Sequence, residues 1–473
     1  MTHAVVPAEP VAPLPDGFGI AVDASAVELG PGLWYGGAPA RVLRLSGAGR
    51  AAWDALRGGA AVHDRATGLV ARRLTDAGLA HPVPPPLTAA PGITVVVPVR
   101  DRAAELDRCL TALGGRYPVV VVDDASHDEV AVRRVAHAHH ARVLRLDVNA
   151  GPGGARTAGL AVVDTELVAF VDSDTEPTAD ALAMLAAHLA DPLVAAAAPR
   201  ILAAAGRSAA DRYTHARGSL DLGTQPARVA PYTPVSYVPT AVLVARAAAV
   251  RDVGGFDPAL RYGEDVDLVW RLVAAGHRVR YAPATTVTHH DPATWRGLLT
   301  RRFRYGTSAA ALSRRHPRNL APLVVHPWYS TAVAAALARR PLLAGAAAVG
   351  AFVTTRRALA GQGVPAQAVQ PRHVAHALGQ SALGTARYAV QFGTPALLAA
   401  TAARRTRPAA LALLLTPALA EWRRRRPALD PVRFTVAAVA DDCAYGGGVV
   451  AGCLAHRTPV PLIPAGPRRL RTR

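Results

Sequence analysis

The chain has 473 residues and carries 53 basic against 34 acidic side chains, a formal charge of +19, and every basic residue is arginine. This length predicts roughly two or three domains, and 51% hydrophobic residues exclude a chain that is disordered throughout. Three cysteines (Cys109, Cys443 and Cys453) exclude a disulfide framework and a zinc site with paired Cys-x-x-Cys ligands, which favours a reducing compartment.

The basic charge is concentrated in the C-terminal third. Residues 1–295 hold 27 arginines and 30 acidic residues, a balance of −3, whereas residues 296–473 hold 26 arginines and four acidic residues, a balance of +22. Aromatic residues make up only 5% of the chain, so a surface that stacks nucleic-acid bases is not expected, and we predict no nucleic-acid partner. The proline-rich, acidic start of the chain predicts no secretory signal.

Residues 1–86 are predicted to form a small N-terminal unit. Alternating side chains at 42–45 indicate a strand, and Ser46 is the expected N-cap of a helix that carries Trp53 and Leu56. A second helix is expected to end at Gly78. Prolines between residues 82 and 91 then predict an extended linker, which places a boundary near 86–91.

Residues 91–310 alternate short apolar runs with longer helical patterns. The expected strands are 93–99, 119–124, 143–146, 167–174 and 241–246, and the expected helices between them are 103–113, 130–140 and 179–190. This alternation predicts an α/β fold with a mostly parallel sheet covered by helices. Ligands bind such sheets beyond the carboxyl ends of the strands, so the residues that follow each apolar run are the first candidates for a site.

Residues 311–473 are predicted to form a helical, arginine-rich region. Its uncharged segments are 319–338, 341–355, 388–403 and 408–420. A spanning helix needs about 20 apolar residues, and only the first segment reaches that length. Flanking arginine pairs favour association with anionic lipid at the cytoplasmic face of the membrane. A helical domain in solution with solvated arginines is the alternative.

Acidic residues follow two of the expected strands. Asp123 and Asp124 end one valine run, and Asp172 and Asp174 follow another. Carboxylates at this spacing can converge on a hard divalent cation, Mg²⁺ or Mn²⁺, that holds a diphosphate. The glycine-rich segment 149–160 between them is expected to form a loop, and it matches neither the dinucleotide-binding nor the P-loop pattern.

Six motifs in this region resemble those of family-2 glycosyltransferases of the GT-A fold, in order and in spacing, over residues 92–310. They are VVVPVRDR, VVVVDDASHD, NAGPGGARTAG, FVDSDTEP, GGFDPALRYGEDVDLVWR and VTHH. The resemblance implies a Rossmann-like nucleotide-sugar-binding domain, a uridine diphosphate (UDP) sugar donor, a divalent metal and transfer with inversion. The asparagine that usually follows the motif arginine in the family is Thr157 here.

The resemblance also implies roles for individual residues. The catalytic base is Asp265 with Glu264 beside it, and the metal ligands are Asp174 and His289, with His290 as the neighbouring alternative. Asp123 accepts a hydrogen bond from uracil, Arg156 lies over the base and the diphosphate, and Asp172 reaches the ribose. The complete nucleotide-sugar-binding set is Pro98, Arg100, Asp101, Asp123, Asp124, Gly151, Arg156, Asp172 and Ser173. Arg301, Arg302 and Arg304 contact diphosphate or lipid, or are simply solvated.

Taken over its whole length, the chain is similar to the glycosyltransferases of the mycofactocin system. The N-terminal unit resembles small peptide-chaperone domains, and DDCAYGGGVVAGC near the C-terminus belongs to the same resemblance. It implies UDP-glucose as donor, a peptide-derived redox cofactor or its precursor as acceptor, and a β-1,4-glucan product. The alternatives are a membrane glycosyltransferase acting on a lipid-linked or cell-wall glycan, and a non-enzymatic peptide-binding scaffold.

Overall fold

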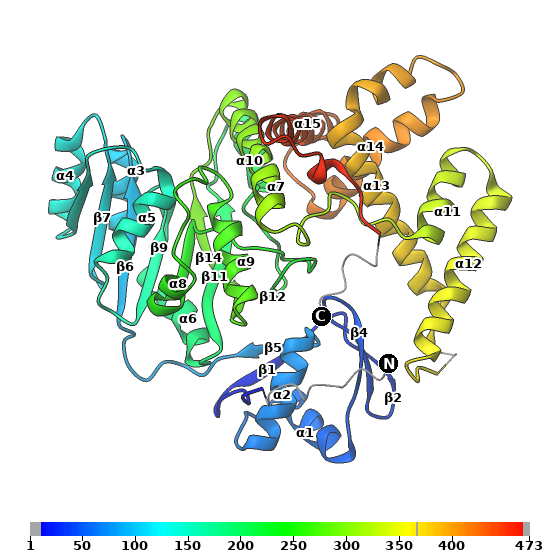
Figure 1. Cartoon of the computed structure of the whole chain (residues 1–473), viewed down its shortest axis with the longest axis horizontal. Coiled ribbons are helices and arrows are strands. Elements are labelled where there is room, and N and C mark those ends of the chain that lie inside the picture. The colour runs from blue at the N-terminus through cyan, green and yellow to red at the C-terminus, as the bar shows by residue number, and fades with distance from the viewer. Residues whose placement is uncertain (1–10, 366–367, 467–473) are drawn as a thin grey trace.

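The computed structural model describes residues 11–365 and 368–466. The first ten residues, on which the prediction of no secretory signal depends, lie outside this range. A small N-terminal unit, a central α/β sheet and a set of C-terminal helices are arranged side by side (Figure 1). The division into 1–86, 91–310 and 311–473 stays a proposal.

The N-terminal unit contains more strands than predicted. Its elements are β1 (Gly19–Val22), β2 (Val27–Gly30), β3 (Leu33–Gly36), β4 (Arg41–Arg44), α1 (Gly47–Arg57), α2 (Arg65–Ala77) and β5 (Ala80–Val83). β1 pairs with β5, and β2, β3 and β4 form a second antiparallel sheet. The predicted helix ends are confirmed: the Ser46 side chain caps α1 by accepting from the Gly49 amide at 3.2 Å, and Gly78 ends α2 with a φ of 72°. Trp53 fills the core against Trp34, with ring centroids 5.0 Å apart.

The central region is a nine-stranded sheet with helices on both faces. Its strands are β6 (Ile93–Val99), β7 (Val119–Asp124), β8 (Arg142–Leu146), β9 (Leu167–Val171), β10 (Thr175–Glu176), β11 (Val194–Ala203), β12 (Ala227–Val229), β13 (Val242–Arg246) and β14 (Arg278–His289). Its helices are α3 (Ala103–Leu113), α4 (Glu129–Ala138), α5 (Gly151–Ala161), α6 (Ala179–Ala187), α7 (Ala209–Arg217), α8 (Ala247–Asp252) and α9 (Glu264–Ala274).

The sheet is parallel in one half and mixed in the other. The strand order is β10-β14-β11-β13-β9-β6-β7-β8, with β12 paired to β14. β9, β6, β7 and β8 run parallel, as predicted, but β13 is antiparallel to both of its neighbours. The expectation of a mostly parallel sheet therefore holds for one half. β11 and β14 were not predicted, because one is alanine-rich and the other carries many polar residues.

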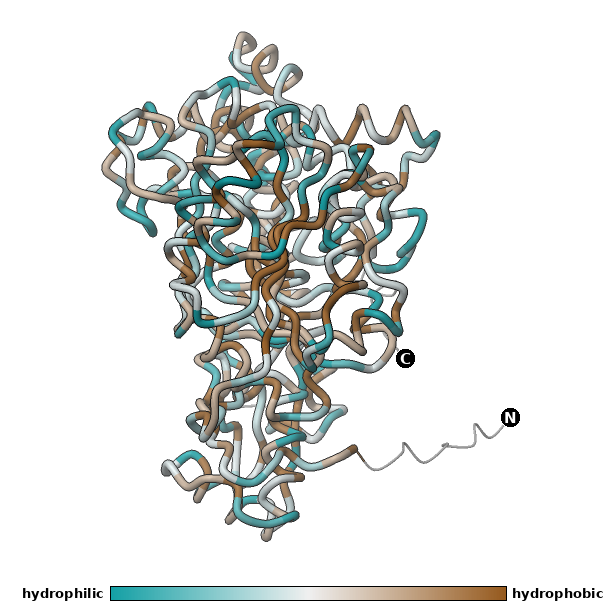
Figure 2. The backbone as a smooth tube through the Cα atoms, turned by 90° about the vertical axis from the view of Figure 1, so that its left-hand side faces the viewer, coloured by the Kyte–Doolittle hydropathy of each residue, from teal (hydrophilic) through white to brown (hydrophobic). Residues whose placement is uncertain are grey.

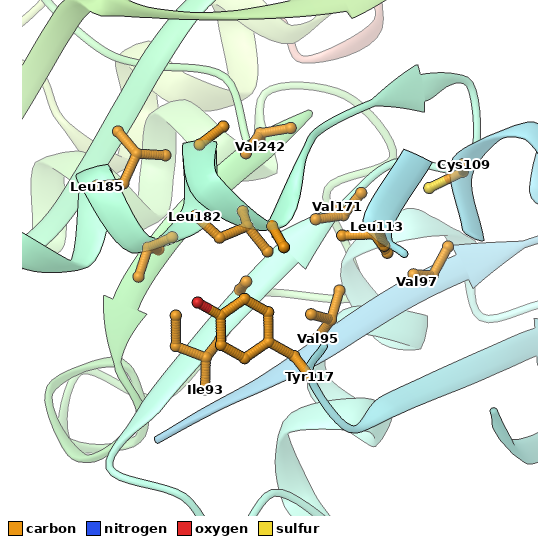
Figure 3. Packing of buried hydrophobic residues seen from close by; sticks show 14 of the residues in the cluster. Ile93, Val95, Val97, Cys109, Leu113, Tyr117, Val171, Leu182, Leu185 and Val242 are labelled. Carbon is orange, nitrogen blue, oxygen red and sulfur yellow. The ribbon is translucent and has the colours of Figure 1, made fainter. Parts of the chain in front are cut away.

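Alternating side chains of each central strand pack into two separate cores. Val95 and Val97 of β6 face α3, α4 and α6, whereas Val96 faces α5, α8 and α9. Figure 3 shows the first core, in which Leu113 and Leu182 lie over the β6 valines. The central strands form a continuous hydrophobic band through the molecule (Figure 2). Full burial of each such side chain stabilises the fold by about 1.5–3 kcal/mol.

Two ion pairs join the N-terminal unit to the sheet. Arg72 of α2 donates to both carboxylate oxygens of Asp191 at 2.7 Å, and neither side chain is more than 2% exposed. Arg278 of β14 makes a similar bidentate pair with Asp76 of α2, at 2.7 and 2.9 Å. The N-terminal unit is thus tied to the central sheet by ion pairs as well as by the linker.

The C-terminal helices pack against the sheet domain along α10. They are α10 (Trp295–Arg315), α11 (Pro327–Leu337), α12 (Pro341–Ala360), α13 (Pro371–Ala400), α14 (Arg407–Arg425) and α15 (Pro431–Ala455). α10 and α15 touch backbone to backbone, because a Cβ on Gly448 would lie 1.9 Å from the Phe303 carbonyl oxygen and one on Gly306 would lie 2.2 Å from that of Tyr445. The glycines of the C-terminal motif therefore set the distance between these helices.

The apolar segments differ from the prediction in length. The uncharged segment 319–338 has the length of a membrane span, but only 327–337 of it is helical, and Pro327 begins that helix at its first turn. The 341–355 segment instead continues as α12 to Ala360. Among the described residues α12 is the one helix that meets the length and hydropathy expected of a membrane span, with a mean hydropathy of 1.2 and 11% of the window buried.

Candidate active site

A cavity of about 1330 Å³ lies at the carboxyl ends of β6, β7 and β9 and is bordered by α9, α10 and α15. Small-molecule sites usually occupy about 300–1,000 Å³, so this cavity has room for a donor and an acceptor together. Most of the predicted site residues line it: Pro98, Arg100, Asp124, Gly151, Arg156, Asp172, Ser173, Asp174, Glu264, Asp265 and His289. The strand topology therefore brings together motifs that are far apart in the sequence.

Asp101 and Asp123 do not line this cavity. The buried Asp123 carboxylate is paired with Arg145 and accepts a hydrogen bond from the Ser126 amide at 2.9 Å. The Asp101 carboxylate accepts from the His127 amide at 2.6 Å and contacts Nδ1 of that histidine at 2.8 Å. Both acids hold the loops after β6 and β7 in place, and their contacts with a nucleotide stay predictions.

The glycine-rich segment 149–160 is not a loop, which corrects the prediction. It forms helix α5, and the Asp124 carboxylate accepts from the backbone amides of Ala150 at 2.6 Å and Gly151 at 3.0 Å at its start. Gly159 allows α5 to lie close on the sheet, because a Cβ there would be 2.4 Å from the Val96 side chain. Gly151 lines the cavity, so the positive end of the α5 dipole faces the space where a diphosphate can bind.

Arg156 connects the acids of two motifs. It is 3% exposed and donates to Asp172 at 2.5 Å and to Glu264 at 2.9 Å, and its guanidinium lies 5.5 Å from the centre of the Phe256 ring. Burial opposes its charge, but the two carboxylates outweigh burial and raise the pKa of Arg156. Arg156 is therefore a fixed cation that positions Asp172 and Glu264 on the wall of the cavity.

Asp174 and His289 meet across the β10–β14 pair, as the predicted metal ligands should. His289 Nε2 lies 3.6 Å from Asp174 Oδ1. Arg102 donates to Asp174 at 2.7 Å, and Arg301 lies 3.8 Å away. Burial alone would raise the pKa of Asp174, but the positive charges of His289, Arg102 and Arg301 have the larger combined effect and lower it below its usual value. The His290 side chain instead contacts Glu176 at 2.6 Å, so it points away from the Asp174 and His289 side chains.

The side chains at this position supply only part of the ligands that a divalent cation needs. No group of three or more His, Cys, Asp or Glu side chains suited to a metal is found within 11–365 and 368–466. An oxygen and a nitrogen from two adjacent strands can still hold Mg²⁺ or Mn²⁺ when substrate phosphates and water complete the shell, which is usual for Mg²⁺. His289 Nδ1 is buried without a hydrogen-bond partner among the described residues, 3.4 Å from the Asp291 carboxylate. Asp174 and His289 are therefore the residues that fit such a cation.

Asp265 and Glu264 begin helix α9, where Gly263 turns the chain with a φ of 79°. Burial, and then the negative charge of Glu264, raise the pKa of Asp265 to about 7. Burial also raises the pKa of Glu264, against the opposing effect of Arg156. A carboxylate with this pKa in a cavity can take up a proton near neutral pH, as a general base must.

The third acid of this motif has a structural role. Asp267 is 1% exposed and accepts from Arg271 at 2.8 Å, and His316 of the α10 C-terminus lies 2.9 Å from it. Asp267 therefore links α9 to the end of α10, while Asp265 faces the cavity.

Two residues that contact the predicted Asp174–His289 pair were not predicted, Arg102 on the cavity wall and Asp291 behind it. Arg102 contacts Asp174, and Asp291 contacts both His289 and Arg301, at 3.4 and 3.2 Å. Asp291 directly follows the VTHH motif, so its place in the sequence could have identified it as a candidate site residue. The three arginines predicted to contact diphosphate or lipid separate in the structure. Arg301 lies near Asp174 and His289, Arg302 pairs with Asp441 at 2.6 Å, and Arg304 is exposed at the cavity.

Comparisons with known proteins identify the family of the chain. Residues 94–251 match glycosyl transferase family 2. The chain is 39% identical over 460 residues to the pre-mycofactocin glycosyltransferase of Mycobacterium tuberculosis, which covers 94% of this chain and 97% of that protein. It is 35% identical over 104 residues to the succinoglycan biosynthesis protein ExoO of Rhizobium meliloti, which covers 21% of this chain and 30% of that one.

Among solved structures, the chain resembles the mannosyltransferase PcManGT of Pyrobaculum calidifontis, described in complex with GDP-Man and Mn²⁺. The identity is 21%, the TM-score is 0.46, and the match covers 77% of this chain and 89% of that one. Residues 1–349 of TarS from S. aureus match with a TM-score of 0.35 over 44% of this chain and 64% of that one. The predicted family is confirmed by the sequence relatives: the chain belongs to the family-2 glycosyltransferases and is similar, over nearly its whole length, to the pre-mycofactocin glycosyltransferase.

Proposed function

We propose that the chain transfers glucose from UDP-glucose to pre-mycofactocin or mycofactocin, with inversion, and builds a β-1,4-glucan by repeated transfer. The observation that carries this proposal is the arrangement of one cavity, with a carboxylate of pKa about 7, Asp265, on one wall and the Asp174–His289 pair on another. The acceptor is proposed from the near full-length similarity to the pre-mycofactocin glycosyltransferase.

The donor half of the cavity is proposed to hold UDP-glucose. Asp174 and His289 would hold a divalent cation, which would supply positive charge next to the diphosphate. Arg102 and Arg301, which contact Asp174 in this structure, lie where they can add charge to the same phosphates. The amino end of α5 adds its dipole. These groups stabilise charge that develops only as the sugar–phosphate bond breaks, so they favour the transition state.

The acceptor half is proposed to use Asp265 as the base. The Asp265 carboxylate removes the proton of the acceptor hydroxyl while the oxygen forms a bond to the anomeric carbon of glucose. The bond from that carbon to the diphosphate breaks in the same displacement, UDP leaves, and the proton stays on Asp265. Attack from the side opposite the leaving group inverts the anomeric centre. Arg156 positions the neighbouring Glu264, whose charge helps to keep the pKa of Asp265 high.

The flanking regions are proposed to bring the enzyme to its acceptor. The N-terminal unit is the proposed peptide-recognition module. For the C-terminal region we propose association with the cytoplasmic face of the membrane. On α12, Leu342 is 89% and Val349 is 62% exposed, and arginine pairs at 339–340 and 356–357 flank or end the apolar stretch. Exposed apolar side chains next to arginines suit an anionic lipid surface.

The exposed face of α12 also favours a second candidate, transfer to a lipid-linked or cell-wall glycan. The purified full chain, given UDP-glucose and Mn²⁺, distinguishes the two when it is offered either pre-mycofactocin or a polyprenyl-linked sugar. Hexose addition to pre-mycofactocin, read by mass spectrometry, supports the proposal, whereas product from the polyprenyl acceptor alone overturns it. No transfer to either acceptor favours the peptide-binding scaffold. Retention of the protein on membranes after a carbonate wash tests the membrane proposal separately.

A further inference from the structure

Three tyrosines from distant parts of the chain line the cavity around the proposed base. Tyr237 precedes β13, Tyr305 lies on α10 and Tyr445 lies on α15, and all three are half-buried. Asp265 lies near enough to Tyr237 and Tyr305 for its negative charge to raise the pKa of both hydroxyls, in addition to the larger effect of burial. Tyr445 lies near enough to Tyr237 to raise the pKa of that hydroxyl as well. The three side chains therefore lie near Asp265, and Tyr305 also lies near Arg301, four residues before it on α10.

The hydroxyl groups of these tyrosines are available to a ligand. None of the three makes a hydrogen bond with any other residue in the described part of the chain, although each one lies in a partly enclosed cavity. Burial raises the pKa of all three, that of Tyr305 to about 12, so they stay protonated at neutral pH. Each can thus donate one hydrogen bond and accept others, beside an aromatic ring.

A buried ion network holds Tyr445 at this position. Arg302 of α10 donates to Asp441 at 2.6 Å, and its guanidinium lies 5.1 Å from the centre of the Tyr445 ring. Asp441 also accepts from Arg217 at 3.0 Å, and Arg217 in turn donates to Asp442 at 2.9 Å. Removing one partner of such a network leaves a buried charge unpaired, which is costly. The DDCAY motif therefore positions a tyrosine as well as joining two helices.

The chemistry of the pocket indicates what binds there. Arg302 is already paired with Asp441, so this part of the wall offers neutral hydroxyls and an aromatic face more than an unpaired cation. Neutral hydroxyls next to aromatic rings suit a ligand that is rich in hydroxyl groups and has apolar C–H faces, which describes a sugar ring. The volume of about 1330 Å³ leaves space for such a ring beside the donor.

We propose that Tyr445, with Tyr237 and Tyr305, forms a subsite that binds the terminal sugar of a glycosylated acceptor. The C-terminal helix α15 is then a part of the active site. This inference rests on the proposed function, because it concerns the second and later transfers to the same acceptor. It makes Tyr445 a specificity-determining residue and Asp441 a positioning residue that acts through Arg302.

Binding of cellobiose to the full chain, in the presence of UDP and Mn²⁺, tests the subsite without turnover. Saturation-transfer NMR gives its Kd. Tyr445→Phe removes one hydroxyl but keeps the ring beside Arg302, and we expect it to raise the Kd about two- to tenfold, the value of one hydrogen bond. Tyr388→Phe is the matched control, because the Tyr388 hydroxyl donates to the Leu462 carbonyl at 2.8 Å and lies outside the cavity. A wild-type protein that does not bind cellobiose, or an unchanged Kd in Tyr445→Phe, overturns the inference.

Kinetics on two acceptors give a second, independent readout. In Tyr445→Phe we expect the KM of the monoglucosylated acceptor, relative to that of the unglycosylated acceptor, to rise about two- to tenfold, while kcat for the monoglucosylated acceptor stays within about twofold. Asp441→Asn should raise the same KM selectively. An equal effect on both acceptors contradicts the subsite. If the wild-type enzyme transfers no glucose at all, the proposed function fails, and the cellobiose measurement still decides the subsite.

Discussion

Asp265→Asn removes the carboxylate to which we assign proton abstraction while it keeps the size of the side chain. A positioned general base typically contributes about 10²- to 10⁴-fold to the rate, so kcat should fall by that factor. The donor half of the cavity is untouched, so binding of UDP should stay close to that of the wild type.

The pH dependence of the wild-type enzyme follows from the raised pKa of Asp265. The base acts in its deprotonated form, so activity rises as the pH rises through the pKa. With a pKa of about 7, roughly one tenth of Asp265 is deprotonated at pH 6 and roughly nine tenths at pH 8, and kcat/KM should increase about tenfold between them. An aspartate with the ordinary value of 3.8 would give no change over this range.

The assay is initial-rate formation of UDP from UDP-glucose and acceptor between pH 5.5 and 8.5. Asp265→Asn should abolish the rising limb. Glu264→Gln should shift its midpoint to lower pH, because it removes the negative charge that helps to raise the pKa of Asp265. Asp180→Asn, at a carboxylate that is 75% exposed, is the matched control and should change neither rate nor midpoint. A rising limb that persists in Asp265→Asn, or a rate within about threefold of the wild type, refutes the assignment.

Three further predictions concern the metal pair, the helix contact and the N-terminal interface. Asp174→Asn should raise the Mn²⁺ concentration needed for half-maximal activity. The increase should exceed the roughly 10- to 100-fold that follows when a residue hydrogen-bonded to a metal ligand is lost. An unchanged Mn²⁺ titration would contradict the assignment of Asp174 as a ligand. Gly448→Ala places a methyl group 1.9 Å from the Phe303 carbonyl oxygen, so it should destabilise the fold by at least about 1–3 kcal/mol in urea unfolding, whereas an unchanged midpoint would show that α10 and α15 are not in contact. Arg72→Met leaves Asp191 buried without its partner and should cost about 3–5 kcal/mol, visible as faster proteolytic release of the N-terminal unit; wild-type resistance would refute this interface.

The sequence determined the parallel half of the sheet with good accuracy. The valine runs at 93–99 and 119–124 became β6 and β7 with the predicted ends, because strands buried on both faces need continuous β-branched residues. Ser46 and Gly78 marked helix ends through local capping chemistry, which does not depend on the rest of the fold.

Elements whose conformation depends on distant contacts were missed. β11 has the sequence VAAAAPRILA, whose alanines favour helix, and becomes a strand because it lies between β13 and β14. Segment 149–160 has four glycines that favour a loop, and it becomes α5 because Asp124 caps it and the sheet packs against Gly159. In both cases tertiary packing overrides local propensity.

In the candidate site too, some residues could be predicted from the sequence, whereas others depend on contacts between distant segments. The acids at strand ends could be placed together from the sequence, because parallel strands direct their carboxyl ends to one edge. Tyr445 could not be placed there, because it lies 140 positions beyond Tyr305 and only the packing of α15 on α10 brings it to the cavity. Arg102 carried no signal that it would contact Asp174.

Mass spectrometry of the small-molecule product tests the central claim most directly. The purified full chain is incubated with UDP-glucose, Mn²⁺ and pre-mycofactocin, with Asp265→Asn as the inactive control. We predict a series of products that differ by single hexoses, β-1,4-linked by NMR and absent with Asp265→Asn. An unmodified acceptor, or a series that forms equally well with Asp265→Asn, would contradict the account.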